Sequence, residues 1–395
     1  MKGRRPGWLR AVVGVTVMGL VTVALLAALD AAVGLARQIH RSEDNRFSDS
    51  LVPAEIGREE TLAYARVRYQ PFTVWSYRPF AGQHITIDAQ GYRSTPTSAP
   101  AEAAKVQLFL FGGSTMLGQG SADRDTIPSH LCRLLNDADS AGGPYRCINL
   151  GVGGYMSTQE VVQLLRLLER DQRPGIVVFY DGANDVLAAL QGTPGDHHGT
   201  RDIAAIYESY QQRRLRHPVL AAIDGALAGL GSTLPATNLV WLAGRVSRVA
   251  ARPVATLAPT DDDVRKAVDV YFTNVQVVCG MAAAMGFRAV LAWQPTIFAK
   301  AALSEPERRI MAHNGAGVEG FRAPWTLASR LWDEARERTK RARDPAVCRV
   351  VDLAEAVRAR TDTVFFDWHH VVPLGNRLVA MALYQTLSAA GWLRQ

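Results

Sequence analysis

Four polar side chains in this chain of 395 residues have the types that serine-based acyl transfer requires. Ser114 follows an apolar run and two glycines, and Asn184 follows another apolar run. Asp367 and His370 stand three positions apart near the end of the chain. A serine hydroxyl becomes a nucleophile when a base lies within hydrogen-bonding reach and a carboxylate orients that base. Asp367 and His370 can supply both groups from one turn, and the amide of Asn184 can donate to an oxyanion.

Each of these short patterns also has an ordinary structural interpretation. A Gly-Ser pair after a strand is a common turn, an asparagine favours turns, and an aspartate just before a histidine can cap a helix. The residues around Ser114 do not spell G-x-S-x-G, so the nucleophile elbow of the α/β-hydrolases is not the template. The chemical interpretation therefore requires a fold that brings the four side chains to one place.

A glycine cluster offers a second kind of oxyanion donor. The stretch 151–154 contains three glycines after a strand-like run and does not complete a G-x-G-x-x-G dinucleotide fingerprint. Apolar residues at helical spacing follow, and Ser157 with Glu160 has the spacing of a capping box. Gly154 is thus expected just before a helix amino terminus, where backbone N–H groups favour negative charge. We expect its N–H to join the oxyanion hole.

Five apolar runs alternate with helical patterns along the chain. This alternation indicates a parallel sheet with helices on both faces, which binds ligands at the carboxyl ends of its strands. Residues 186–260 do not fit it, and we interpret them as a helical insertion over the sheet edge, or a lid. Within that segment, Asp196, His197 and His198 indicate an exposed polar turn rather than a metal site. The five runs are 106–110, 145–150, 175–180, 287–293 and 348–353.

The order of these motifs resembles the SGNH/GDSL hydrolase superfamily over about residues 105–392. The segments similar to its first, second, third and fifth blocks are 112–115, 149–154, 182–185 and 367–370. Gly113 and Thr115 stand where the first block usually has Asp and Leu, a departure that removes no catalytic group. The five-residue step from His370 to Gly375 is similar to the family's spacing, so the resemblance favours His370 over His369 as the base.

The resemblance implies a flavodoxin-like, three-layer α/β/α fold and a serine mechanism without metal or cofactor. Ser114 would attack an ester carbonyl while His370 takes its proton and Asp367 orients His370. The backbone N–H groups of Ser114 and Gly154 and the amide of Asn184 would hold the oxyanion. Water would then release the acyl group from the enzyme.

Fold and triad do not choose a substrate, because the superfamily includes carbohydrate acetylesterases, lipases, thioesterases and acyltransferases. We expect a serine esterase that removes an acyl group, an acetyl group first of all, from a cell-envelope or polysaccharide substrate. The alternatives are an O-acyltransferase, a lipase or a thioesterase with the same triad. An alternative of another class is a non-catalytic glycan-binding or assembly protein, against which the intact set of polar groups argues.

The amino terminus has the pattern of a membrane anchor. Residues 1–10 carry four basic residues and no acid, and residues 11–29 are uncharged, mainly apolar and long enough to cross a bilayer as a helix. The basic head is expected in the cytoplasm and the catalytic domain outside, in the periplasm or beyond the cell. A cleavable signal peptide is the alternative, with small residues near Ala28, Ala31 and Ala32 as its cleavage site.

A linker over 30–60 and a small β addition over 61–104 are expected before the main domain, 105–395. Aromatic residues with Pro and Gly turns indicate short strands in the addition. Its segment 91–93, Gly-Tyr-Arg, is similar to an addition often seen before this domain in exported bacterial members. The net charge is +7, and the first ten residues carry +4 of it. The remaining charge is too small to indicate a nucleic-acid surface.

All four cysteines follow the apolar segment, where an oxidising compartment would favour disulfides. Cys132 is expected on the helix that feeds the strand of Cys147, and such neighbours can approach to bonding distance. Cys279 and Cys348 are expected on a later helix and the fifth strand, at the other side of the sheet. We therefore expect the pairs Cys132–Cys147 and Cys279–Cys348, with four buried free thiols as the alternative.

Overall fold

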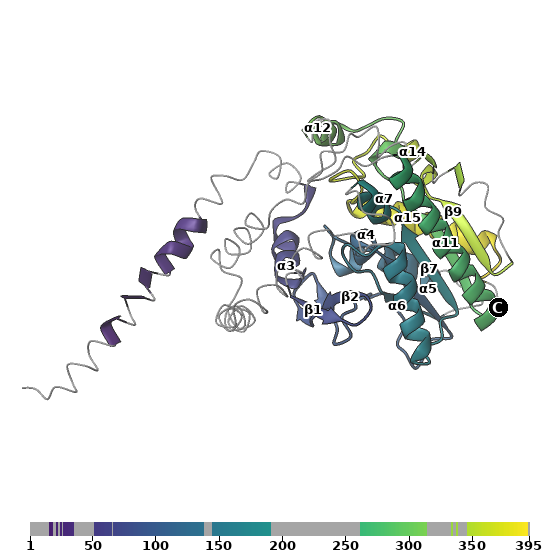
Figure 1. The fold of residues 1–395 in the computed structure, drawn as a ribbon, viewed down its shortest axis with the longest axis horizontal. Coiled ribbons are helices and arrows are strands. Elements are labelled where there is room, and N and C mark those ends of the chain that lie inside the picture. The colour runs from purple at the N-terminus through teal and green to yellow at the C-terminus, as the bar shows by residue number, and fades with distance from the viewer. Residues whose placement is uncertain are drawn as a thin grey trace, which may run out of the picture. The chain divides into compact units, whose positions relative to one another are not determined.

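The computed structural model describes the chain in several stretches, and the other residues are drawn as a thin grey trace in Figure 1. Met1–Glu43 and Asp202–Val254 form one unit, and Asp44–Arg201 and Ala255–Gln395 form another. The predicted head 1–10 and residues 191–260 of the predicted insertion lie outside the described residues. The described stretches are 16–18, 21–22, 24–25, 27–34, 51–64, 66–137, 144–190, 261–313, 333–334, 337–338 and 346–393.

The second unit contains a five-stranded parallel sheet with the strand order β6-β5-β7-β8-β9. This is the flavodoxin-like order, so the predicted fold class is confirmed. Each strand begins and ends within two residues of its predicted bounds, because strands covered on both faces are continuous apolar runs. The strands are β5 (Val106–Gly112), β6 (Tyr145–Asn149), β7 (Ile176–Asp181), β8 (Arg288–Trp293) and β9 (Cys348–Asp352).

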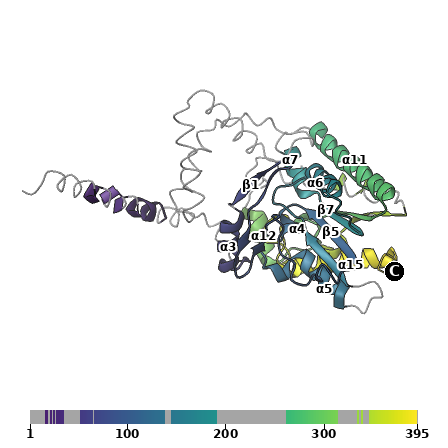
Figure 2. The ribbon, with the colours of Figure 1, turned by 90° about the horizontal axis from the view of Figure 1, so that it is seen from below.

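Helices cover both faces of the sheet and make a three-layer structure (Figures 1 and 2). Helices α5 (Ile127–Asp137) and α15 (Pro373–Ala389) pack against one face. Helices α6 (Ser157–Glu169), α7 (Ala183–Leu190) and α11 (Asp261–Met285) pack against the other. Successive residues of β5 alternate between the two cores. Shorter helices are α4 (Ser114–Leu117), α12 (Glu305–His313) and α14 (Glu355–Arg358), with 3-10 turns η1 (Asp123–Asp125) and η2 (Ile297–Ala299).

One disulfide lies in each core, and both predicted pairs are confirmed. Cys132 of α5 is bonded to Cys147 of β6, with their Cα atoms 6.0 Å apart. Cys279 of α11 is bonded to Cys348 of β9 across the opposite face, with their Cα atoms 5.5 Å apart. Each bridge therefore ties a covering helix to an edge strand of the sheet.

The addition before the main domain contains helix α3 (Ala54–Tyr64) and two small antiparallel pairs. Strands β1 (Val67–Gln70) and β2 (Val74–Tyr77) form one pair, and β3 (Phe80–Ala81) and β4 (Thr86–Ile87) form the other. The predicted linker 30–60 is therefore wrong over its last residues, which are helical. Only Ile56 and Ala63 of α3 are buried, so the helix has almost no apolar periodicity to detect.

The predicted start of the insertion at residue 186 also needs correction. Helix α7 continues to Leu190, and Val186 packs in the core above the sheet. The apolar residues after Asn184 therefore belong to the main domain. The boundary was misplaced because a short helix that follows its strand directly leaves no turn signal between them.

The described residues between 16 and 34 are helical and mostly exposed, including Val17, Met18 and Leu25. The helix of the described chain that is long and apolar enough to cross a membrane is another one, Val268–Met285 within α11. That helix packs one side into the core and carries Cys279, which identifies it as a core helix.

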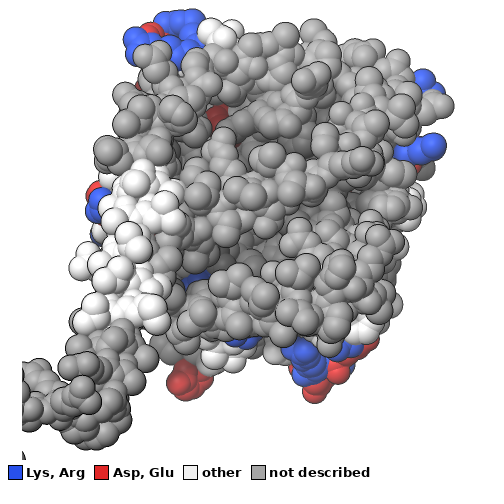
Figure 3. All heavy atoms as spheres, turned by 60° about the vertical axis from the view of Figure 1, so that its left-hand side comes forward, with Lys and Arg blue, Asp and Glu red and all other residues white. Residues whose placement is uncertain are grey.

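In the face shown in Figure 3, the visible Lys and Arg side chains lie in small groups, several beside Asp or Glu.

Candidate active site

The nucleophile candidate sits where β5 ends. Ser114 is the first residue of α4, and its side chain is almost fully buried. A Cβ added at Gly113, the residue before Ser114, would lie 2.1 Å from the Asn184 side-chain nitrogen, so a side chain at position 113 would require the Asn184 amide to shift. Gly113 and Asn184, which follow the adjacent strands β5 and β7, are thus close neighbours.

Asp367 and His370 complete a hydrogen-bonded series with Ser114. His370 Nε2 lies 2.6 Å from Ser114 Oγ, and His370 Nδ1 lies 2.5 Å from Asp367 Oδ2. The other carboxylate oxygen, Oδ1, accepts the backbone N–H groups of His369 and His370 at 2.8 and 2.7 Å. A β-bridge between Phe365 and Val371 closes this loop. The two residues of the D-x-x-H motif therefore act from one tight turn.

Electrostatics hold Asp367 ionised. Burial alone would raise the pKa of this carboxyl, but the two neighbouring histidines and their hydrogen bonds bring it well below its usual range. A carboxylate that stays charged fixes a proton on His370 Nδ1, which leaves Nε2 free to accept the Ser114 hydroxyl proton. This is the protonation pattern that a general base requires.

His369 occupies a different environment from His370. Its ring packs against the rings of Trp368 and His370, and its Nδ1 lies 3.5 Å from Asp367 Oδ1 without a hydrogen bond to any described residue. Burial lowers the pKa of His369 to about 3, so this ring stays neutral. The structure therefore places His370, and not His369, against Ser114, as the resemblance implied.

Asp367, His369 and His370 are the one group of side chains in the described chain that could hold a metal. Their donor atoms lie within 4.8 Å of one another. However, both ring nitrogens of His370 already take part in hydrogen bonds, one to Asp367 and one to Ser114. This donor set fits a proton relay better than a metal centre.

The glycine cluster supplies one unused backbone donor. The N–H of Gly151 donates to Asn149 Oδ1 at 3.0 Å, and the N–H of Gly153 donates to the Tyr77 hydroxyl at 3.1 Å. Among the described residues, no acceptor takes the N–H of Gly154 or of Ser114. Gly154 has a φ of 80°, a conformation that glycine adopts without strain. These contacts favour Gly154 among the three glycines.

Asn184 is held beside the same loop. Its Nδ2 donates one hydrogen bond to the backbone carbonyl of Tyr155 at 2.7 Å. A side-chain amide carries two N–H donors, so one donor of Asn184 is left for a ligand. The structure thus brings together the three predicted oxyanion donors, Ser114, Gly154 and Asn184, around the turn that carries Ser114.

A buried polar group that includes Ser157, Glu160 and Asp185 follows the glycine cluster and was not predicted from the sequence. The predicted capping box of Ser157 and Glu160 is wrong, because Ser157 Oγ donates to Asp185 at 2.6 Å and Glu160 is fully buried. The residue that caps α6 is Met156, whose N–H donates to the Gln159 side chain at 3.3 Å. Burial, with the nearby Asp181, raises the pKa of Glu160 well above its usual range. The same residue types, Ser and Glu, occur in capping boxes and in buried polar networks, so spacing alone could not separate the two roles.

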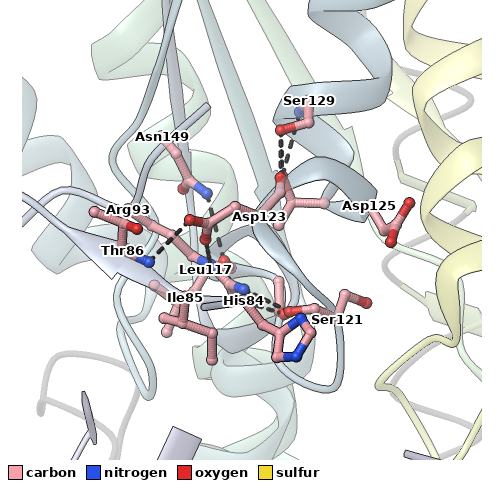
Figure 4. A network of polar contacts seen from close by, with 12 residues as sticks. His84, Ile85, Thr86, Arg93, Leu117, Ser121, Asp123, Asp125, Ser129 and Asn149 are labelled. Atoms are coloured by element: carbon pink, nitrogen blue, oxygen red, sulfur yellow. Dashed lines mark hydrogen bonds and ion pairs between the residues drawn. The ribbon is translucent and has the colours of Figure 1, made fainter. Parts of the chain in front are cut away.

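A second network joins the amino-terminal addition to the nucleophile turn (Figure 4). At its centre is Arg93, whose fully buried guanidinium pairs with Asp123 at 2.9 Å. The other acceptors of its hydrogen bonds are the Tyr64 hydroxyl and the carbonyls of Leu117, Gly118 and Ser121. Arg93 therefore fixes the end of α4, three to four residues after Ser114. The resemblance of segment 91–93 does not predict this role, because the partners of Arg93 lie 24 to 30 residues away along the chain and include backbone carbonyls.

Helix α3 adds one acid close to the site. Glu60 Oε1 accepts the N–H of Gly120 at 2.6 Å. Burial raises the pKa of Glu60 to about 7, although this hydrogen bond and the charges of Arg93 and His370 oppose the rise. Gly120 in turn packs against Phe366, whose ring stacks on His370 at 5.5 Å. The predicted linker thus contributes a titratable group beside the triad loop.

No protein-family model and no curated protein matches this chain. Solved structures similar to it include Axe2, an acetylxylan esterase from Geobacillus stearothermophilus, at 14% identity, 74% coverage of this chain, 98% of that chain and a TM-score of 0.34. A GDSL-like lipase from Bacteroides thetaiotaomicron has 14% identity, 72% and 88% coverage and a TM-score of 0.35. An alpha/beta hydrolase from the metagenome of Lake Arreo has 13% identity, 74% and 98% coverage and a TM-score of 0.36.

At these identities and TM-scores, the likenesses carry no weight for the chemistry, which rests on the site itself. The described chain holds a serine, a histidine and an aspartate in hydrogen-bonded series at the carboxyl edge of a parallel sheet. This is the fold and the motif order that the resemblance to the SGNH/GDSL superfamily predicts.

Proposed function

We propose that this chain is a serine ester hydrolase of the SGNH/GDSL type. The observation that carries the proposal is the 2.6 Å contact between Ser114 Oγ and His370 Nε2, with Asp367 bonded to the other ring nitrogen. Few structural needs would place a buried serine, histidine and ionised aspartate in this series, whereas acyl transfer needs all three.

In the proposed reaction, Ser114 Oγ attacks the carbonyl carbon of an ester while His370 Nε2 takes the hydroxyl proton. The negative charge that develops on the carbonyl oxygen is held by the N–H groups of Ser114 and Gly154 and by the Asn184 amide. The alkoxide leaves with the proton from His370, and the acyl group remains on Ser114. Water, deprotonated by His370, then releases the acid and restores the serine.

The proposed substrate is an acylated polymer of the cell envelope, and the proposed acyl group is acetyl. The location of this substrate is supported by the amino-terminal segment, whose described residues form an exposed apolar helix. It is also supported by the two disulfides, which persist in compartments outside the cytoplasm. We propose that residues 11–29 anchor the chain in the cytoplasmic membrane with the catalytic domain outside.

The test is hydrolysis by the full chain in detergent. Nitrophenyl esters of increasing acyl length and acetate release from acetylated glycans would be measured together. We expect the acetyl esters to react fastest and Ser114→Ala to lower kcat by about two orders of magnitude or more. Ser98→Ala is the matched control, since this hydroxyl only bonds the backbone of Cys147. Equal rates in Ser114→Ala and Ser98→Ala would overturn the proposal.

A further inference from the structure

A cavity of about 420 Å³ lies on the outer side of the loop that carries Gly154. Its walls come from the β1–β2 hairpin, from the segment around Tyr92 and from the second half of α6. It falls in the size range of small-molecule sites. The triad residues do not line it, so it is separate from the site described above.

The charged side chains that line the cavity are all basic. They are Arg68, Arg166 and Arg170, and no Asp or Glu is among the lining residues. Arg166 pairs with Glu169, and the terminal nitrogens of Arg68 donate to the carbonyls of Ala89 and Gln90, which leaves its Nε without an acceptor among the described residues. No ion pair of Arg170 is present among the described residues, so Arg170 is the arginine of the lining that is available to an anion. Arginine suits carboxylate and phosphate groups because its planar fork can donate two parallel hydrogen bonds. The lining therefore fits an anionic group.

The remaining lining fits a sugar. Tyr69 is three-quarters exposed at the cavity, and the partly buried Tyr92 also lines it. Flat apolar rings with polar edges pack against sugar faces, and side-chain amides such as that of Gln163 can bond hydroxyl groups. The buried oxygen of Gln163 has no partner among the described residues. An acidic sugar combines the anion with these ring and amide contacts.

One residue connects this cavity to the oxyanion loop. Tyr155 is among the lining residues, its hydroxyl donates to the carbonyl of Trp75, and its own carbonyl accepts the amide of Asn184. Tyr155 also follows Gly154 directly. A polymer that fills the cavity would therefore lie against the segment that holds two of the proposed oxyanion donors.

The turn at the rim of the cavity is strained. Phe72 and Val74 have φ values of 70° and 76°, and such values are rare for any residue except glycine and most costly for a β-branched one. Arg166 lies over the ring of Phe72 at 4.8 Å. Strain of this kind gathers at sites that hold ligands.

From these contacts we propose that the cavity is an accessory subsite that binds an anionic group, a carboxylate or a phosphate, carried on the glycan whose ester reacts at Ser114. The proposal rests on the proposed function for the reaction, and on the arginine-lined cavity for the binding. It assigns an acidic glycan as the substrate class.

Binding is tested with the full chain in detergent, made inactive by Ser114→Ala so that no probe is consumed. Three probes of equal length are titrated: a galacturonate tetramer, a phosphorylated glucose tetramer and an uncharged glucose tetramer. We expect one acidic tetramer to bind at least about tenfold more tightly than the uncharged one, the gain of a charge-assisted hydrogen bond. The two acidic arms distinguish carboxylate from phosphate.

Two arginines at the same end of α6 give a matched pair. Arg170 lines the cavity, whereas Arg173 is exposed, bonds Asp171 and does not line it. We expect Arg170→Gln to weaken binding of the acidic tetramer about tenfold and Arg173→Gln to leave it unchanged. In the active enzyme, Arg170→Gln should raise KM for an acetylated acidic glycan without changing kcat, and should not affect a small neutral ester.

Equal binding of all three tetramers, or equal effects of Arg170→Gln and Arg173→Gln, would overturn the subsite. If binding behaves as expected but Ser114→Ala does not affect ester hydrolysis, the subsite stands and the proposed reaction fails. If hydrolysis requires Ser114 but neither acidic tetramer binds, the reaction stands and the subsite fails. The two proposals can therefore fail separately.

Discussion

Asp367 accepts hydrogen bonds through both carboxylate oxygens, and this explains how one short motif can supply two of the three members of a triad. One oxygen takes two backbone N–H groups of its own turn, and the other takes His370 Nδ1. The backbone contacts fix the position of the carboxylate, and the carboxylate fixes the ring. Asparagine at this position would keep the shape but not the charge that stabilises a protonated His370.

The two adjacent histidines should differ sharply on mutation. We expect His370→Ala to lower kcat by about two orders of magnitude or more, because Ser114 loses its base. His369→Ala should keep most of the activity, since this ring only packs against its neighbours and stays neutral. Ester hydrolysis by both variants, with near-ultraviolet circular dichroism as the check on folding, decides the ranking. The reverse order would exchange the two roles.

Glu60 should make the stability of the protein depend on pH. Its pKa is about 7 in the folded chain, against an ordinary value of 4.5. The folded state therefore keeps a proton that the unfolded state loses, so this group lowers the free energy of unfolding as pH rises from 4.5 to about 7. The loss would be up to about 3 kcal/mol. We expect Glu60→Gln, which keeps an oxygen for the Gly120 N–H, to remove this decline.

Urea unfolding of the wild type and of Glu60→Gln at several pH values between 4 and 8 measures the difference in their free energies of unfolding. Glu55→Gln is the control, because Glu55 is exposed on the same helix, α3. The difference in stability between Glu60→Gln and the wild type should grow with pH in this window and then level off. A difference that is independent of pH would contradict a raised pKa at Glu60.

The elements that carry the triad depend on the amino-terminal addition through Arg93. This guanidinium is buried between the addition and the end of α4 and neutralises Asp123. We expect Arg93→Met to destabilise the protein by about 3–5 kcal/mol, because it leaves the buried carboxylate of Asp123 without its charged partner. Activity should fall with it, since α4 begins at Ser114. Thermal unfolding and kcat are the measurements.

Two further variants separate charge from packing in this test. Arg124→Met removes an exposed arginine that pairs only with Asp125, and should have little effect on stability. The double variant Arg93→Met with Asp123→Asn should recover part of the loss, because no unpaired charge remains. If Arg93→Met were no more destabilising than Arg124→Met, Arg93 would not be the link between the addition and the site.

The main elements could be predicted from the sequence because the sheet is buried on both faces and its strands are continuous apolar runs. The order of the polar groups at the strand ends could be predicted for the same reason, since parallel strands bring their carboxyl ends to one edge. Arg93, Glu60 and Asp185 could not be assigned roles. The partners of these residues lie far away along the chain, as Gly120 does from Glu60, or are buried polar groups. Such contacts produce no periodic or local pattern in the sequence.

The molecule as a whole combines an apolar amino-terminal segment with a domain that two disulfides tie together. Each disulfide joins a covering helix to an outer strand, one on each face of the sheet. The pairing could be predicted from the neighbourhood of helix and strand, whereas the placement of the catalytic domain outside the membrane remains a proposal. Cysteine pairs and an apolar anchor are consistent with one another in an oxidising compartment.

This topology predicts how the protein behaves in intact cells. Protease added to bacterial spheroplasts should cleave the catalytic domain while a cytoplasmic marker protein stays intact, because the basic head keeps residues 1–10 inside. The mature protein should retain residues 11–29. A protected domain would contradict the orientation, and a mature chain that begins after residue 29 would show a cleaved signal peptide instead of an anchor.

Covalent trapping of Ser114 tests the proposed nucleophile most directly. An alkyl fluorophosphonate reacts with a serine only when a neighbouring base activates it, and peptide mass spectrometry locates the adduct. We expect one adduct, on Ser114, that disappears in Ser114→Ala, is strongly reduced in His370→Ala and persists in Ser98→Ala. An unlabelled Ser114, or an adduct on another serine together with full ester hydrolysis by Ser114→Ala, would contradict the assignment of Ser114 as the nucleophile.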